Sequence, residues 1–125
     1  MQQLKKDFSF IKKEVAGVLL FGSAVSDVRR ARDYDICLVA PQKDSGEIMK
    51  KIFHTLNLEK KRYEVYCFEE LPLYMKWEVI REHDLIYALN PGEIYEYFYY
   101  FRKLYAEQKH RMELSKEELF EQVAH

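Results

Sequence analysis

Two aspartates separated by one residue, Asp33 and Asp35, begin an apolar segment that continues to Val39. Alternate side chains of a β-strand point to the same face, so these two carboxylates are expected to lie side by side. Neighbouring carboxylates repel each other, and a fold tolerates them mainly when a cation lies between them. Asp33 and Asp35 are therefore candidate ligands of Mg²⁺, which prefers hard oxygen donors. The alternative is a pair of solvated acids at the edge of a strand.

A Gly-Ser pair, Gly22 and Ser23, follows the apolar run Leu19–Phe21 and precedes Asp33 by a short stretch. Glycine lets the backbone approach a ligand closely, and the serine hydroxyl and the following amides can donate to phosphate oxygens. The same pair also fits an ordinary turn from strand to helix, with Ser23 as the N-cap. A divalent metal beside a phosphate site indicates phosphoryl or nucleotidyl transfer.

The order of an apolar strand, Gly22-Ser23, a variable stretch and Asp33-Tyr34-Asp35 resembles the signature of the DNA polymerase beta nucleotidyltransferase superfamily. The small size of the chain and the segment 63–72 narrow the resemblance to the minimal nucleotidyltransferases, called MNT proteins, over roughly residues 16–88. The resemblance implies a site for ATP or another NTP and for two Mg²⁺ ions, with Mn²⁺ as a substitute.

In that family a third carboxylate, usually an aspartate, comes from the neighbouring strand, and here the matching position holds Glu64. Glutamate is one methylene longer, so Glu64 could ligate the same ion or act as general base for the acceptor hydroxyl. The alternative is a polar residue on an edge strand. The resemblance thus assigns Asp33, Asp35 and Glu64 to catalysis and metal binding, and Gly22 and Ser23 to the triphosphate.

A basic cluster, Arg29, Arg30 and Arg32, lies between the Gly-Ser pair and the aspartates. These arginines could neutralise phosphates or pyrophosphate, although a solvated loop cluster is an equal alternative. Many minimal family members have an arginine directly after Gly-Ser and a glycine later, whereas this chain has 24-AVSD-27. No phosphate contact is therefore predicted from that stretch.

The elements that must position these residues follow from hydrophobic periodicity and turn signals. Leu4, Phe8, Ile11 and Val15 have the spacing of an amphipathic first helix. Strands are expected over 16–21, 33–40, 62–68 and 84–89. Helices are expected over 23–30 and 71–83. Three more helices are expected to begin after the capping box at 44–47, after the break at 90–92 and at the cap 115–118. This order predicts an α/β (α+β) fold with a small mixed sheet of about four strands backed by helices. We expect one domain, with a polymerase-beta-like core over about 1–89 and a helical extension over about 92–125.

Composition narrows the class of protein further. A formal net charge of −1 with 33% charged residues gives a balanced surface, so binding to long nucleic acid is not expected. Cys37 and Cys67 fall in expected buried strands, which predicts reduced apolar side chains and not a disulfide. The chain shows no signal peptide and no apolar run near the ~20 residues that span a bilayer, so we expect a cytoplasmic protein without a membrane segment.

The short chain has no room for domains that hold template and primer, so templated synthesis is not expected. The resemblance implies an antitoxin of a HEPN/MNT toxin–antitoxin module, which transfers AMP from ATP to a tyrosine of a helical HEPN partner. The alternative is a catalytically weak or inactive nucleotidyltransferase-fold module that neutralises its partner by contact. Surplus tyrosines of the last long helix, Tyr95, Tyr99 and Tyr100, could serve a partner interface or self-association. That helix could also simply pack on its own domain through the stripe Ile94, Tyr97, Phe98, Phe101, Leu104 and Tyr105.

Overall fold

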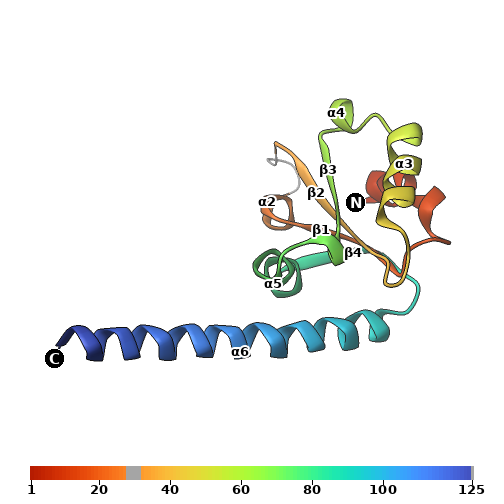
Figure 1. Ribbon diagram of the computed structural model, residues 1–125. Helices are drawn as coiled ribbons and strands as arrows, with labels where there is room; N and C mark the ends of the chain where they lie inside the picture. The colour runs from red at the N-terminus through yellow and green to blue at the C-terminus, as the bar shows by residue number, and fades with distance from the viewer. Residues whose placement is uncertain (28–31, 125) are drawn as a thin grey trace.

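A four-stranded mixed sheet organises the computed structural model, which describes residues 1–27 and 32–124, with side chains up to residue 113. The strands lie in the order β3-β2-β1-β4 (Figure 1). Central β1 is antiparallel to both of its neighbours, and β2 is parallel to edge strand β3. The strands are β1 (Gly17–Phe21), β2 (Tyr34–Val39), β3 (Tyr63–Cys67) and β4 (His83–Ala88). The expected mixed sheet of four strands is confirmed.

Helices cover both faces of this sheet, as Figure 1 shows. The α-helices are α1 (Gln2–Asp7), α2 (Ser23–Ser26), α3 (Ser45–Thr55), α4 (Leu58–Lys61), α5 (Leu73–Arg81) and α6 (Pro91–Ala124). Two 3₁₀ turns, η1 (Ser9–Ile11) and η2 (Phe68–Glu70), complete the described elements. Alternating strand residues form two separate cores, because successive side chains of a strand point to opposite faces.

The α1 face of the sheet is the side on which α1 and α3 pack. There Leu20 of β1 and Ile36 of β2 are fully buried with Ile52 of α3. The α5 face is the side covered by α5 and α6, where Leu19 and Cys37 are buried with Val79. Residues of β2 with odd numbers therefore belong to the α5 face, and that face includes Asp35.

The first helix is shorter than its periodicity predicts. Leu4, Phe8, Ile11 and Val15 are all buried, as an amphipathic helix requires, yet α1 ends at Asp7 and a 3₁₀ turn follows. Tertiary bonds hold the end of α1, since the Asp7 carboxylate accepts from the Tyr63 hydroxyl at 2.6 Å and from the Lys61 ammonium at 3.1 Å. The same four apolar residues reach the core from a helix followed by a turn.

The helix expected over 23–30 is shorter than predicted, because α2 ends at Ser26 and the backbone of Asp27 is extended. Two other local predictions hold. Asp44 is the N-cap of α3, and its carboxylate accepts from the amides of Gly46 at 2.9 Å and Glu47 at 3.3 Å. Both cysteines, Cys37 and Cys67, are buried and free, as predicted.

The final helix corrects one expectation. The expected cap at 115–118 starts no new helix, because α6 runs unbroken from Pro91 to Ala124. After Gly92 the sequence contains no glycine or proline, so nothing in it interrupts the helix. Ile94 and Phe98 are buried against the sheet, whereas Tyr95, Tyr99 and Tyr100 are exposed. The distal part of α6 projects beyond the rest of the molecule (Figure 1).

Candidate active site

Gly22 follows the end of β1 and faces the carboxylate of Asp35. Phe21, the last residue of β1, is the register partner of Asp35. Gly22 has φ 75° and ψ −155°, a conformation that L side chains rarely adopt. A Cβ placed on Gly22 would lie 2.3 Å from Oδ2 of Asp35. Backbone conformation and carboxylate contact therefore both require glycine at this position.

Asp35 and Glu64 are direct register partners on the parallel strands β2 and β3, and their side chains are hydrogen-bonded. Partial burial, the hydrogen bond and charge of Glu64, and the charge of Asp33 raise the pKa of Asp35 to about 6. Asp33 is exposed just before β2 begins, and Asp35 is half-buried. The structure therefore brings Gly22, Asp33, Asp35 and Glu64 together at one end of the sheet.

The chemistry of this donor set suits a hard cation. Asp35 and Glu64 lie within hydrogen-bonding reach of each other, where two negative charges would repel. A divalent ion in that place would compensate the charge of both carboxylates. In the part of the chain that the structure describes, no three His, Cys, Asp or Glu side chains already stand in a ligating arrangement. Binding of a cation through all three acids would therefore require their side chains to rearrange.

The Gly-Ser turn borders a hollow of about 410 Å³, lined by Phe21, Gly22, Ser23, Ser26, Met75, Glu78 and Glu82. Gly22 is the N-cap of α2 and Ser23 is its first residue, so the alternative role of Ser23 as N-cap is wrong. Ser23 is exposed and lies beside the hollow, where its hydroxyl can reach a ligand.

Sequence reasoning missed three polar residues around this site. Glu78 and Glu82 of the α5 segment border the hollow, and the Tyr66 hydroxyl donates to Glu64 Oε2 at 3.0 Å. A period of two on β3 could have revealed Tyr66, since it follows Glu64 on the same face. Glu78 and Glu82 are about one helical turn apart, but no local pattern in the sequence predicts that α5 packs beside the Gly-Ser turn.

Of the three arginines in the basic cluster, Arg32 is exposed beside Asp33. The other two, Arg29 and Arg30, lie outside the described residues.

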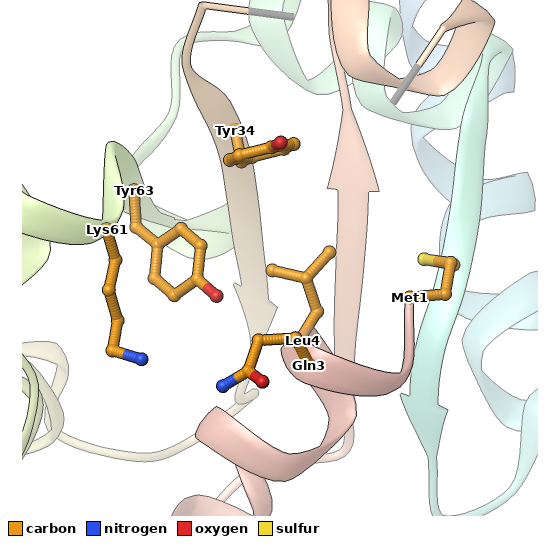
Figure 2. Close-up of a pocket in the computed structure, with 6 residues that line it drawn as sticks. All are labelled: Met1, Gln3, Leu4, Tyr34, Lys61 and Tyr63. Carbon is orange, nitrogen blue, oxygen red and sulfur yellow. The ribbon is translucent and has the colours of Figure 1, made fainter. Parts of the chain in front are cut away.

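A separate pocket lies on the α1 face. Figure 2 shows Tyr34 and Tyr63 from neighbouring strands beside Lys61 and residues of the first helix. This pocket has a volume of about 230 Å³ and is lined by Met1, Gln3, Leu4, Tyr34, Lys61 and Tyr63. Tyr34 and Asp35 are adjacent on β2, so their side chains point to opposite faces of the sheet. The sheet therefore lies between this pocket and the carboxylates. The pocket is therefore not part of the candidate active site.

Comparisons with known proteins identify the family of this chain. Residues 2–91 match the family model described as "Polymerase beta, Nucleotidyltransferase". A protein of Methanocaldococcus jannaschii, named "Putative protein adenylyltransferase MJ1547", is 37% identical over 101 residues, which cover 79% of this chain and 76% of that protein. The chain therefore belongs to the polymerase-beta-like nucleotidyltransferase family of enzymes.

Solved structures show the same fold at low sequence identity. A chain of a crystal structure of "the toxin-antitoxin with AMP-PNP" superposes with a TM-score of 0.71 at 11% identity, covering 96% of this chain and 99% of that chain. A chain from a complex of tri-AMPylated Shewanella oneidensis HEPN toxin with MNT antitoxin gives a TM-score of 0.63 at 15% identity, covering 96% and 99%. The fold is that of the minimal nucleotidyltransferases.

No helix within residues 1–27 and 32–124 is both long and apolar enough to cross a bilayer.

Proposed function

We propose that this protein transfers a nucleoside monophosphate, AMP from ATP, to a hydroxyl of a partner protein in a Mg²⁺-dependent reaction. The observation that carries the proposal is the hydrogen-bonded pair Asp35–Glu64 with the Gly22 backbone against it. Such a pair of acids is costly without a cation, and the hollow beside Ser23 offers space for a ligand. The relative named as an adenylyltransferase supports AMP as the transferred group.

Each candidate site residue would have a distinct role in this reaction. Asp33, Asp35 and Glu64 would hold Mg²⁺, in one or two ions, through carboxylate oxygens. The bound cation would supply positive charge that stabilises the phosphates during in-line displacement. Gly22 leaves room for the phosphate chain beside Asp35, and Ser23 donates its hydroxyl to phosphate oxygens. Arg32 lies exposed near Asp33, where it can offset the charge of departing pyrophosphate, a role that Arg29 and Arg30 could share.

The acceptor belongs to a helical HEPN-type partner in this proposal. Solved structures with this fold include a complex of MNT antitoxin with a tri-AMPylated HEPN toxin, which supports a partner of that kind. The exposed tyrosines of α6, Tyr95, Tyr99 and Tyr100, offer aromatic surface for such an interface. We further propose that the chain is a single domain that acts in the cytoplasm, with α6 as its partner-binding extension.

Labelling tests the proposal. The protein would be incubated with α-labelled ATP, Mg²⁺ and the HEPN-type protein that co-purifies with it, and we expect label on that partner. Asp35→Asn and Asp33→Asn should abolish the label. Asp44→Asn is the matched control, because asparagine also caps helices and Asp44 caps α3 away from the site.

Titration calorimetry separates transfer from neutralisation by contact. Tight Mg²⁺-dependent binding of ATP that Asp35→Asn removes would support the enzyme. Partner binding without any nucleotide binding by the wild-type protein would instead support an inactive binding module and overturn the proposal.

A further inference from the structure

Tyr66 is a polar neighbour of the carboxylates that the proposed function leaves without a role. Its hydroxyl donates to Glu64 Oε2 at 3.0 Å. Glu64 itself is exposed on edge strand β3, and within residues 1–27 and 32–113 its carboxylate hydrogen-bonds only with Tyr66 and Asp35. A glutamate has three side-chain torsions, so an exposed one samples many rotamers unless a partner holds it.

Packing fixes the ring of Tyr66. Tyr66 lies on β3 and Phe21 on β1, and β2 separates these two strands. Backbones two strands apart are about 10 Å from each other, yet the ring centroids of Phe21 and Tyr66 are 5.6 Å apart with an edge-on angle of 63°. The rings must therefore lean toward each other over β2. This contact ties Tyr66 to β1, which ends at Phe21 directly before Gly22.

The Tyr66 hydroxyl suits this placement because a tyrosine hydroxyl can donate a hydrogen bond and an ionised carboxylate can only accept one. The Tyr66 hydroxyl thus occupies one Glu64 oxygen, while Glu64 is the register partner of Asp35.

We propose that Tyr66 is a positioning residue, which holds the Glu64 carboxylate toward Asp35 so that the acids can bind a divalent cation together. The inference rests on the proposed function, because it assigns Glu64 to that cation. It predicts that the Tyr66 hydroxyl matters only while Glu64 is present. A residue that merely supports the fold would instead contribute equally with and without Glu64.

Tyr66→Phe tests this role, because phenylalanine keeps the ring against Phe21 and loses only the hydroxyl. The control is Tyr63→Phe, on the same strand and also bonded to a carboxylate, that of Asp7 at 2.6 Å, but on the α1 face. Mn²⁺ binding to the full chain would be measured by electron paramagnetic resonance, without nucleotide. We expect Tyr66→Phe to weaken Mn²⁺ binding about tenfold, within the range for a lost charge-assisted hydrogen bond. Tyr63→Phe should leave Mn²⁺ affinity unchanged.

A double-mutant cycle decides between positioning and general support of the fold. In a Glu64→Ala background, which has no side-chain acceptor, Tyr66→Phe should cause no further loss of Mn²⁺ affinity, and labelling of the partner should show the same pattern in kcat. Equal losses in both backgrounds, or unchanged Mn²⁺ affinity of Tyr66→Phe, would overturn the role of Tyr66 while leaving the proposed function intact. Wild-type protein that binds neither Mn²⁺ nor Mg²⁺-ATP would overturn both.

Discussion

Replacement of Gly22 by alanine gives the sharpest test of how the candidate site is built. The backbone of Gly22 has φ 75° and ψ −155°, and a Cβ would lie 2.3 Å from Oδ2 of Asp35. A residue other than glycine in this region costs about 1–3 kcal/mol in backbone strain. The Asp35 side chain must also move, and its contact with Glu64 would be disturbed. We therefore expect Gly22→Ala to lower the free energy of unfolding by about 2–4 kcal/mol.

Urea unfolding measures this loss directly. The single tryptophan, Trp77 on α5, stacks on Tyr105 of α6 with ring centroids 4.8 Å apart, so its fluorescence reports the packing of these helices. Far-UV circular dichroism would follow the same transition and check that it is two-state. Gly46→Ala is the matched control, because Gly46 has no positive φ and its Cβ would meet only Asp44 Oδ1 at 3.2 Å. That control should change stability by no more than about 1 kcal/mol, since alanine is the better helix former.

The result that refutes this reasoning is a Gly22→Ala protein that unfolds within about 0.5 kcal/mol of wild type and still binds Mn²⁺ equally well. Such a protein would show that neither the backbone conformation nor the approach of Asp35 constrains the turn. A loss of stability shared equally by Gly46→Ala would likewise contradict a cause specific to Gly22.

Three further predictions concern stability. The pKa of Asp35 is raised from an ordinary 3.8 to about 6, so the metal-free folded state binds a proton more tightly than the unfolded state does. The free energy of unfolding should therefore fall as the pH rises from about 4 to 6, and it should stay reduced at pH 7. Asp35→Asn should therefore stabilise the metal-free protein by about 1–2 kcal/mol at pH 7, after allowance for solvent screening, and by little at pH 4; urea unfolding at both pH values checks this, and equal effects would contradict it. Tyr97→Phe removes a 2.9 Å hydrogen bond from α6 to Glu69 and should cost about 1–2 kcal/mol, measured by the same unfolding, while an unchanged midpoint would show that the bond contributes nothing. Asp44→Ala should cost about 1 kcal/mol through loss of the α3 cap, and Asp44→Asn should restore it; a loss that asparagine does not rescue would argue against capping.

The sequence predicts those parts of the fold that depend on local patterns. Short apolar runs locate the central strands β1 and β2, and the resemblance assigns Glu64 to a strand beside the aspartates, which the register of β2 and β3 confirms. The cap at Asp44 is equally local, because its side chain reaches amides only two and three residues away. Whether Asp33, Asp35 and Glu64 bind metal stays a prediction.

Contacts between distant segments could not be read from the sequence in the same way. The end of α1 depends on bonds from Asp7 to Tyr63 and Lys61, which are more than 50 residues away. The hollow beside Ser23 depends on where α5 packs, and helical periodicity does not encode that position. Ser115 resembles a cap, yet α6 continues through it, because capping propensity is too weak to end a helix without a breaker.

Under the proposed function, the acidic lining of the hollow beside the Gly-Ser turn would couple the binding of the cation to that of the nucleotide. Glu78 and Glu82 border the hollow, and so does Gly22, against which the Asp35 carboxylate lies. A nucleoside triphosphate that enters without a cation would meet negative charge, so its binding free energy would be small. Cation and nucleotide would then each increase the affinity for the other by the same factor, as thermodynamic linkage requires. Under the proposed function, the site would therefore favour the metal complex of a nucleotide over the free nucleotide.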